Sequence, residues 1–520
     1  MPGCLHSINI ENFKAFREFC LNLEGRHLLI YGSNGSGKSS LYWALYTFLQ
    51  SAQKDTPDVS KYFDSANPQN LLNIHEQGEA NPKPGAIALT LRDTSTKIET
   101  TYRIDLTNHG TKAQPVITKG DLSSDFITYR FFFGFSDFRN SEKFDIWPLF
   151  EKEILPFCVS TGGTIPLESW NAIKVGNPNP RNRVGFAGSD AYSAFRKKVV
   201  GFATVLPGII DSISRESQKF YDKYFANDDP AKITLKLAVT TKPSVSGSSK
   251  KDFKFTKPII EFGIQIDGET INKPQTFLNE AKLTQFALSV RFAASLVNLH
   301  ESDLKLLVLD DILVSLDMSN RMKVVEILQS ESFRGYQQII MTHDRGLFNE
   351  VRRQIQNNND WLFVTLSGNS HNGINSSAEK SPLQKAKDYF YENKLDEAAQ
   401  HLRIAAEENV KNYWQVTLNQ NLTEGFTPLS KHMKSIRNHV EGNLLQRCIH
   451  SLEQDEALEF SEEDKQKAET LKIIKALEKM KDRVLNPAAH HNEVPLYEAE
   501  VEKTLDLIKQ LESKMAEGGI

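Results

Sequence analysis

A loop near the start of the chain has the residue types needed to bind a phosphate chain. It reads Gly32-Ser33-Asn34-Gly35-Ser36-Gly37-Lys38-Ser39 and matches the pattern G-x-x-x-x-G-K-[ST] completely. Glycines in such a loop let backbone N–H groups turn inward around an anion. The lysine then reaches the β- and γ-phosphates of a nucleotide, and the serine hydroxyl binds Mg²⁺. The plainer alternative is a Gly/Ser-rich turn before a helix.

Acidic and imidazole side chains follow two apolar runs far downstream. Asp310 and Asp311 end the run that begins at Leu304, and His343 ends another. A carboxylate at a strand end can hold the Mg²⁺ bound by Ser39, directly or through water. Asp311 can orient an attacking water molecule, and His343 can contact a γ-phosphate. Each of these residues by itself is common at the end of a strand. Their order after a complete phosphate loop makes the set specific.

The segments around these residues predict an α/β fold. The apolar run 28–31 before the loop predicts a buried strand, and the apolar spacing after the loop is helical. Alternating residues at 87–91 and 101–106 predict an antiparallel hairpin. A strongly amphipathic helix is expected to open at 278–282, ahead of the Asp-Asp strand.

This order of motifs resembles the ABC-type P-loop ATPase heads of the RecF, SMC and Rad50 class over roughly residues 1–366. The resemblance implies ATP and Mg²⁺ as cofactors, two heads that sandwich two nucleotides, and a signature segment that contacts the partner's γ-phosphate. Here Asn279 and Ala281 replace the usual Ser and Gly of that segment, and Asp311 replaces the commoner Glu. Slow hydrolysis is therefore expected.

The resemblance assigns Mg²⁺ to Ser39 and Asp310, and hydrolysis to Asp311 and His343. The remaining nucleotide contacts that we expect are Lys14, Ser33, Asn34, Gly35, Ser36, Gly37, Lys38, Ser40, Asn279 and Asp317.

Changes in composition divide the chain into five parts. Residues 1–150 are expected to form the N-terminal lobe of the head and 276–366 its C-terminal lobe. Between them, 151–275 is expected to be an insertion with a short helical pair and strands, and the helical pattern is expected to break near Pro207. This insertion is too short to form the long coiled-coil arm of SMC relatives. Residues 367–381 are predicted to be a linker, and 382–520 an all-α bundle.

One aromatic segment and one basic segment each allow two interpretations. The aromatic segment 126–150, with Arg130 and Arg139, is either a core cluster or a base-stacking surface, and its uniformly apolar character favours a core. The lysines at 250, 251 and 254 form either a solvated turn or a patch that contacts phosphate.

The C-terminal bundle carries residues that suit RNA cleavage. Arg403 and Glu407 share a helix face, and His490 follows a later helix. This set resembles the anticodon nucleases PrrC and RloC, and the spacing from Arg483 to His490 resembles HEPN ribonucleases. Histidine can transfer the 2′-hydroxyl proton and arginine can stabilise the phosphorane. The alternatives are a surface salt bridge and a packed histidine, in a bundle that docks a partner.

Composition limits the function classes. A net charge of −4 gives no global attraction to nucleic acid, and no apolar run is long enough for a membrane span, so we expect a cytoplasmic protein without a signal peptide. Its four scattered cysteines argue against a zinc site.

The layout of a head with a short insertion and a helical tail resembles PtuA, the ATPase of Septu and some retron anti-phage systems. The leading hypothesis is an ATP-gated sensor in such a toxin-like defence system. It would control either its own C-terminal nuclease, acting on tRNA, other RNA or DNA, or a partner HNH subunit such as PtuB. The rival hypothesis is a RecF-like DNA-repair module without nuclease activity.

Overall fold

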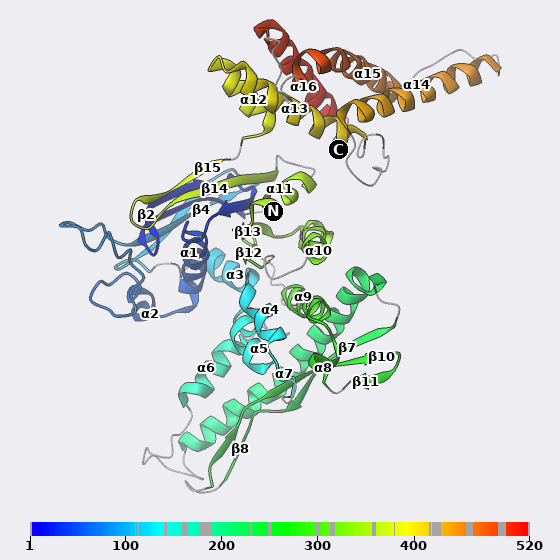
Figure 1. Ribbon diagram of the computed structural model, residues 1–520. Helices are drawn as coiled ribbons and strands as arrows, with labels where there is room; N and C mark the ends of the chain where they lie inside the picture. The colour runs from blue at the N-terminus through cyan, green and yellow to red at the C-terminus, as the bar shows by residue number, and fades with distance from the viewer. Residues whose placement is uncertain are drawn as a thin grey trace. The chain divides into compact units, whose positions relative to one another are not determined.

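The computed structural model divides the chain into two compact units, Met1–Ala378 and Glu379–Ile520 (Figure 1). The structure describes residues 3–109, 111, 114–139, 143–158, 165–176, 190–228, 231–247, 252–271, 273–297, 302–312, 318–355, 360–378, 380–414, 418, 428–453, 461–486 and 496–517.

A six-stranded sheet forms the centre of the first unit. Its strand order is β15-β14-β3-β13-β12-β6, and every neighbouring pair is parallel except β14 with β15. The middle residues of the interior strands β3, β13 and β12 are apolar because both faces of the sheet are covered. The bounds are β3 His27–Gly32, β6 Asp125–Thr128, β12 Leu306–Asp310, β13 Gln337–Thr342, β14 Trp361–Asn369 and β15 Gly373–Ala378.

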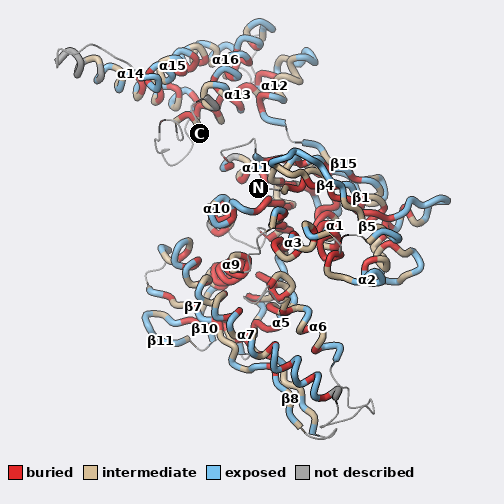
Figure 2. Tube along the Cα trace, turned by 180° about the vertical axis from the view of Figure 1, so that it is seen from behind, coloured by how far each residue is buried: buried red, intermediate tan, exposed pale blue. Residues whose placement is uncertain are grey.

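Alternate residues of this sheet enter two different cores. Leu28 and Ile30 pack with helix α1 (Lys38–Gln50) on one face, whereas Leu29 packs on the other. This is the period-two alternation of side chains along a strand. The phosphate loop therefore follows a strand whose two faces are both packed. In Figure 2 the buried segments are concentrated around this sheet.

A second, four-stranded sheet packs on the α1 side, with order β2-β1-β4-β5. Its strands are all antiparallel, and β4 with β5 confirms the predicted hairpin. The Gln337 amide ties the two sheets together because it donates to the Leu5 carbonyl at 3.0 Å and accepts from the Leu5 N–H at 2.8 Å. The bounds are β1 Gly3–Phe13, β2 Phe16–Asn22, β4 Ala86–Asp93 and β5 Glu99–Asp105.

Helices complete the first unit. The predicted signature helix is α9, Glu280–Val297, and nearly all of it is buried. In the aromatic segment, Phe131, Phe132 and Phe135 are core residues, which confirms the core interpretation. The other helices are α2 Thr56–Ser60, α3 Pro115–Ser123, α4 Tyr129–Ser136, α5 Trp147–Glu153, α8 Pro274–Phe277, α10 Met318–Gln329 and α11 Arg345–Gln354.

The insertion consists of helices and short strands. Helix α7 runs unbroken from Asp190 to Tyr224, so the predicted break near Pro207 is wrong. Proline in a helix interior costs about 3 kcal/mol, but buried residues continue on both sides of Pro207, from Phe202 to Ile213. The other elements are α6 Pro166–Gly176, β7 Ile233–Thr241, β8 Ser244–Ser246, β9 Lys254–Thr256, β10 Ile259–Ile266 and β11 Glu269–Ile271.

Most of the predicted linker is a hairpin instead. Residues 367–369 continue β14 and 373–378 form β15, which pairs with β14 along its whole length. Gly368 and Gly373 adopt the left-handed conformation that the tight turn requires (φ 97° and 88°). Strand β15 lies at the edge of the sheet, where polar residues are normal. Because its sequence is polar, the hairpin has the composition of a linker. The boundary between the units follows Ala378.

The second unit is helical, as predicted from the sequence. Its helices pack around an apolar core that includes Leu402, Ile436, Ile474 and Ile508. Their bounds are α12 Pro382–Tyr391, α13 Leu395–Asn412, α14 Leu429–Glu453, α15 Glu462–Met480, a π-helical turn Lys481–Leu485 and α16 Glu498–Glu517. Within the described parts of both units, no helix has the length and apolar character needed to cross a membrane.

Candidate functional site

The phosphate loop has the backbone geometry that an anion cradle needs. Gly35 and Gly37 lie in the left-handed region (φ 86° and 96°). A side chain on Gly32 would collide with the Ser36 hydroxyl, so this glycine is required by space. Helix α1 begins directly after the loop, and Gly37 provides no side-chain cap for its first N–H groups. Free N–H groups at a helix N-terminus attract negative charge.

Lys38 is held inside the loop. Its ammonium donates to the Gly32 carbonyl at 2.7 Å and to the Ser33 carbonyl at 3.3 Å. Burial lowers the pKa of Lys38, while the carboxylates of Asp311 and Asp310 oppose that shift. The cation is thus oriented before any ligand arrives.

The structure brings Asp310 to the end of the phosphate loop. Burial raises the pKa of Asp310 to about 6, and the nearby Ser39 side chain acts in the opposite direction. The Oδ1 atom of Asp310 is buried and has no hydrogen-bond partner among the described residues. An unsatisfied carboxylate oxygen beside a hydroxyl fits Mg²⁺, which favours oxygen ligands and binds through one or two carboxylates plus phosphates.

Asp311 and His343 form a pair beside this position. Oδ1 of Asp311 accepts from the His343 backbone N–H at 3.0 Å and lies 3.1 Å from its Nδ1 atom. Asp311 has a left-handed backbone (φ 53°), an uncommon conformation for a residue other than glycine that is enriched at active sites. The neighbouring Asp344 instead caps α11 through Leu347 and pairs with Arg321 at 2.7 Å.

Lys14 and Ser40 lie where the β1–β2 turn meets α1. The Ser40 hydroxyl accepts a hydrogen bond from the Ala15 N–H at 3.3 Å. The Lys14 ammonium lies 5.6 Å from the centre of the Trp43 ring, and burial lowers its pKa. Both residues are therefore next to the loop, and their contact with a nucleotide stays a prediction.

Arg130 is a further residue of this region to which the sequence analysis assigned no nucleotide role. Thr128 is the parallel-sheet partner of Asp310, and α4 starts directly after it. Arg130 occupies the first turn of α4, and its positive charge acts on Asp310 in the direction that lowers the pKa of that carboxyl. The pairing of β6 with β12 creates this neighbourhood, and no local motif signals it.

The signature segment opens α9. Oδ1 of Asn279 accepts a hydrogen bond from the Lys282 N–H at 2.9 Å, as a residue at a helix N-terminus does. The side chain of Phe277, just before it, is 67% exposed. Asp317 lies outside the described residues.

In the C-terminal unit, Arg403 and Glu407 form an ion pair at 3.0 Å. The Arg403 guanidinium also donates to the Leu485 carbonyl at 3.1 Å and to Oδ1 of Asn486 at 3.3 Å. This pair therefore contacts the residues that directly precede the segment carrying His490, although His490 itself lies outside the described residues.

Two other side chains, those of Arg483 and His432, bear on the predicted cluster of Arg403, Glu407 and His490. Arg483 pairs with Glu500 at 2.8 Å on the surface. His432 of α14 was not predicted as a site residue, yet the charge of Glu407 acts on it. Burial is the largest effect on His432 and lowers its pKa. Arg403 and Glu407 therefore form a direct pair, whereas His432 is linked to Glu407 only through its charge.

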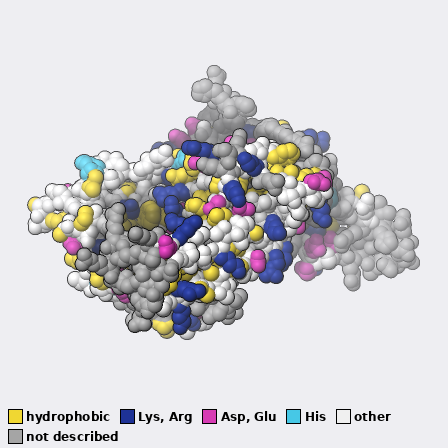
Figure 3. Space-filling view, turned by 90° about the horizontal axis from the view of Figure 1, so that it is seen from below, with side chains coloured by type: hydrophobic (Ala, Val, Ile, Leu, Met, Phe, Trp, Pro, Cys, Tyr) yellow, Lys and Arg dark blue, Asp and Glu magenta, His cyan; other side chains and the backbone are white. Residues whose placement is uncertain are grey.

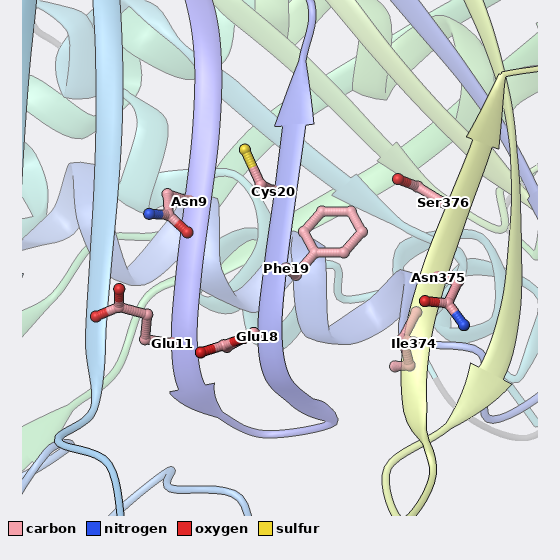
Figure 4. Close-up of a pocket in the computed structure, with 8 residues that line it drawn as sticks. All are labelled: Asn9, Glu11, Glu18, Phe19, Cys20, Ile374, Asn375 and Ser376. Atoms are coloured by element: carbon pink, nitrogen blue, oxygen red, sulfur yellow. The ribbon is translucent and has the colours of Figure 1, made fainter.

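A separate groove of about 420 Å³ lies between β2 and β15 (Figure 4). Glu11 and Glu18 line one part of it, and Asn375 and Ser376 another. None of the residues that line this groove belongs to the phosphate loop, so the groove is separate from the candidate nucleotide site.

Comparison with known proteins identifies the first unit. No curated protein sequence matches the chain. Solved structures with a similar fold include RecF with ATP from the RecFOR pathway, 12% identical with a TM-score of 0.41, covering 73% of this chain and 98% of that one. An Smc head from Pyrococcus furiosus bound to the C-terminal domain of ScpA is 12% identical, with a TM-score of 0.37, covering 75% and 100%. The SMC head domain from Thermotoga maritima is 13% identical, with a TM-score of 0.33, covering 72% and 99%.

The family match extends across both lobes of the head. The model of the RecF/RecN/SMC N-terminal domain matches residues 4–360, which include the phosphate loop, the insertion and the Asp-Asp strand. The predicted fold, an α/β ABC-type head followed by a helical region, is thereby confirmed. The chain belongs to the RecF/RecN/SMC N-terminal domain family and is an ATP-binding, ABC-type ATPase of the RecF/SMC class.

Proposed function

We propose that this protein is an ATP-gated regulator that controls a nuclease in an anti-phage defence system. The observation that carries the ATP-dependent part is the proximity of Ser39 and Asp310. It joins the two halves of the head at one point and leaves a buried carboxylate oxygen without a partner among the described residues.

The residues of the head have distinct roles in this proposal. The loop N–H groups and Lys38 bind the phosphates, and Ser39 and Asp310 hold Mg²⁺, which neutralises phosphate charge when bound. Asp311, fixed by His343, orients the attacking water and takes up its proton. The shorter side chain of Asp311 relative to Glu is expected to make this step slow.

ATP-dependent pairing of two copies is the second element of the proposal. Asn279 and the first residues of α9 that follow it would contact the nucleotide held by the other copy. Phe133 and Phe277 are 64% and 67% exposed, and they belong to α4 and α8, the elements next to the start of α9. Large exposed apolar side chains are typical of surfaces that bind a partner.

The C-terminal unit is proposed to be the effector. Arg403 contacts Asn486, four residues before His490 in the sequence, which supports a common site for Arg403, Glu407 and His490. Arginine would stabilise the charged phosphorane and histidine would move the proton in a metal-independent RNA cleavage. A partner HNH subunit remains the other form of the same hypothesis.

Purified protein incubated with ATP and total RNA tests this function. RNA cleavage that His490→Ala abolishes supports an effector within the chain. Cleavage only after a partner nuclease subunit is added supports the two-subunit form. ATP-dependent binding of duplex DNA without any nuclease activity, alone or with a partner, would contradict nuclease control and favour a RecF-like repair role.

A further inference from the structure

Two histidines from distant parts of the first unit meet at its surface. His75 lies in the loop between α2 and β4, and His371 lies in the turn between β14 and β15. Their ring centres are 5.0 Å apart, and the ring planes are nearly perpendicular, at 79°. His75 is half-buried and His371 is exposed, so ions from solvent can reach the pair.

Histidine is a scarce residue in this chain. The sequence has 13 histidines against 62 lysines and arginines. On the face shown in Figure 3, histidine side chains are accordingly few, whereas Lys and Arg side chains are widespread. An imidazole pair that two separate loops bring together is therefore a specific feature of the fold rather than a product of composition.

Asparagine side chains hold the backbone of both histidines. Oδ1 of Asn73 accepts from the His75 N–H at 3.0 Å, and Oδ1 of Asn369 accepts from the His371 N–H at 3.0 Å. The side-chain amide of Asn73 also donates to the Ser370 carbonyl at 3.4 Å, which joins the two loops directly. The positions of the two histidines are thus set before any ligand binds.

The hydrogen bond of the His371 ring leaves one ring nitrogen available. Its Nδ1 atom lies 2.7 Å from Oδ1 of Asn372. An amide oxygen can only accept, so the proton lies on Nδ1 and the lone pair on Nε2. A carbonyl oxygen at the second ring nitrogen is the usual arrangement for histidines that bind metal ions. The His75 ring has no hydrogen-bond or ion-pair partner in the described part of the chain.

The separation of the rings matches two imidazoles bound to one ion. A Zn–N bond of about 2.0–2.1 Å places each ring centre about 3 Å from the metal, so two rings at the tetrahedral angle have centres about 5 Å apart. The observed separation of His75 and His371 is 5.0 Å. An edge-to-face contact between two aromatic rings gives a similar distance, and binding measurements separate the two explanations.

We infer that His75 and His371 form a binding site for a divalent transition-metal ion such as Zn²⁺. Imidazole nitrogen suits Zn²⁺, Cu²⁺ and Ni²⁺, whereas Mg²⁺ requires oxygen ligands. Among the described residues no third His, Cys, Asp or Glu side chain joins the pair, so water completes the coordination. The site differs in residues and in chemistry from the Mg²⁺ position proposed at Ser39 and Asp310, and it goes beyond the proposed control of a nuclease.

A metal ion at this site would connect the β14–β15 turn to the loop that supports the β1–β2 turn. The Asn73 side-chain amide donates to the Lys14 carbonyl at 2.8 Å, and the Leu71 carbonyl accepts from the Lys14 N–H at 2.7 Å. An ion that binds only the folded state stabilises it by mass action. Zn²⁺ should therefore raise the temperature at which the protein unfolds.

Calorimetric titration of the untagged, nucleotide-free full chain with Zn²⁺ tests the inference. Excess Mg²⁺ is included because it occupies sites made of oxygen ligands and leaves imidazoles free. The wild type should bind one equivalent of Zn²⁺ whose affinity falls at least about tenfold in His75→Ala and in His371→Ala. Asn372→Ala removes the acceptor for Nδ1 of His371 and should weaken the same binding by about tenfold.

His401→Ala is the matched control. The His401 ring also lies against another ring, at 5.3 Å, but this neighbour is Tyr389 rather than a second histidine. The control should bind Zn²⁺ as the wild type does. All variants should unfold cooperatively on heating without metal, which shows that they are folded. Added Zn²⁺ should raise the unfolding temperature of the wild type and of His401→Ala, but not that of His75→Ala or His371→Ala.

Three outcomes would overturn the inference. The first is no saturable binding of Zn²⁺ by the wild type. The second is equal binding by the wild type and by His75→Ala/His371→Ala, which would mean that the two rings only pack against each other. The third is an equal loss of binding in His401→Ala and in the variants of the site. None of these outcomes bears on ATP hydrolysis or on cleavage by the C-terminal unit, so failure here is distinguishable from failure of the proposed function.

Discussion

The Ser39 side chain lies near the carboxylate of Asp310 and favours its charged form, although the two residues come from opposite halves of the head. Ser39 lies at the start of α1, and Asp310 ends β12. Parallel strands β3, β13 and β12 lie side by side, so their carboxyl ends meet at one edge of the sheet. Ligands of open α/β sheets bind at such an edge.

Replacing the loop lysine should remove nucleotide binding. Lys38→Ala deletes the ammonium that Gly32 and Ser33 orient, so affinity for a fluorescent ATP analogue should fall by at least about a hundredfold, or ~2.7 kcal/mol. Lys119→Ala, at an exposed position of α3, is the control and should bind normally. Retained affinity in Lys38→Ala would show that the nucleotide binds elsewhere.

Magnesium-dependent nucleotide binding should weaken as the pH falls through about 6. Burial raises the pKa of Asp310 to about 6, so its carboxylate is protonated below this pH and no longer binds a cation. In Asp310→Asn the Mg²⁺ dependence should disappear at every pH. Titrations of Mg²⁺ at fixed nucleotide concentration measure this effect, and a flat profile from about pH 5 to pH 7 in the wild type would contradict it.

The same shift predicts a trend in stability without metal. Because folding raises the pKa of this acid, the folded state binds the proton more tightly than the unfolded state. Stability should therefore fall by up to about 3 kcal/mol as the pH rises from about 4 to about 6. Asp310→Asn should lack this contribution, which urea unfolding at several pH values can measure.

Hydrolysis should depend on Asp311 more than nucleotide binding does. Asp311→Asn should lower kcat by about 10²-fold or more while ATP affinity stays within a few-fold. His343→Ala should have a smaller effect, because the backbone N–H at this position still holds Oδ1 of Asp311. Asp344→Ala is the matched control, since Asp344 caps α11, and it should lower stability by about 1 kcal/mol and leave kcat unchanged.

Arg130 is expected to assist hydrolysis by stabilising negative charge near Asp310. Arg130→Ala should lower kcat by about tenfold, or ~1.4 kcal/mol, and Arg130→Lys should restore part of the rate because it keeps the charge. Arg334→Ala, at a highly exposed side chain, should behave as the wild type. An equal loss in Arg130→Lys and Arg130→Ala would indicate that charge alone does not explain the effect.

The C-terminal cluster can be tested against a structural role. Arg403→Ala breaks the contacts to Leu485 and Asn486 and should destabilise the second unit by about 1–3 kcal/mol. Arg437→Ala, which breaks the pair with Glu478 at 2.9 Å in the same unit, serves as the control. RNA cleavage lost in Arg403→Ala and Glu407→Gln but kept in Arg437→Ala supports catalysis. Parallel losses in all three would point to folding alone.

Local patterns predicted the parts of the head whose residues carry a strong local signal. The middle residues of strands β3, β12 and β13 are apolar because both faces are buried, and the phosphate loop has its own sequence pattern. The course of α7 through Pro207 could not be predicted, because its stability comes from packing against distant segments. The β14–β15 hairpin was missed because its edge strand is polar, and the position of Arg130 depends on which strand lies next to β12.

Strand β3, which leads into the phosphate loop, lies between β14 and β13 in the sheet. Both of these neighbours are synthesised after the insertion and α9. A nascent chain that ends before residue 361 would lack one flank of this strand, so ATP affinity should arise late in translation. Truncated products should therefore be unable to compete with the finished protein for ATP.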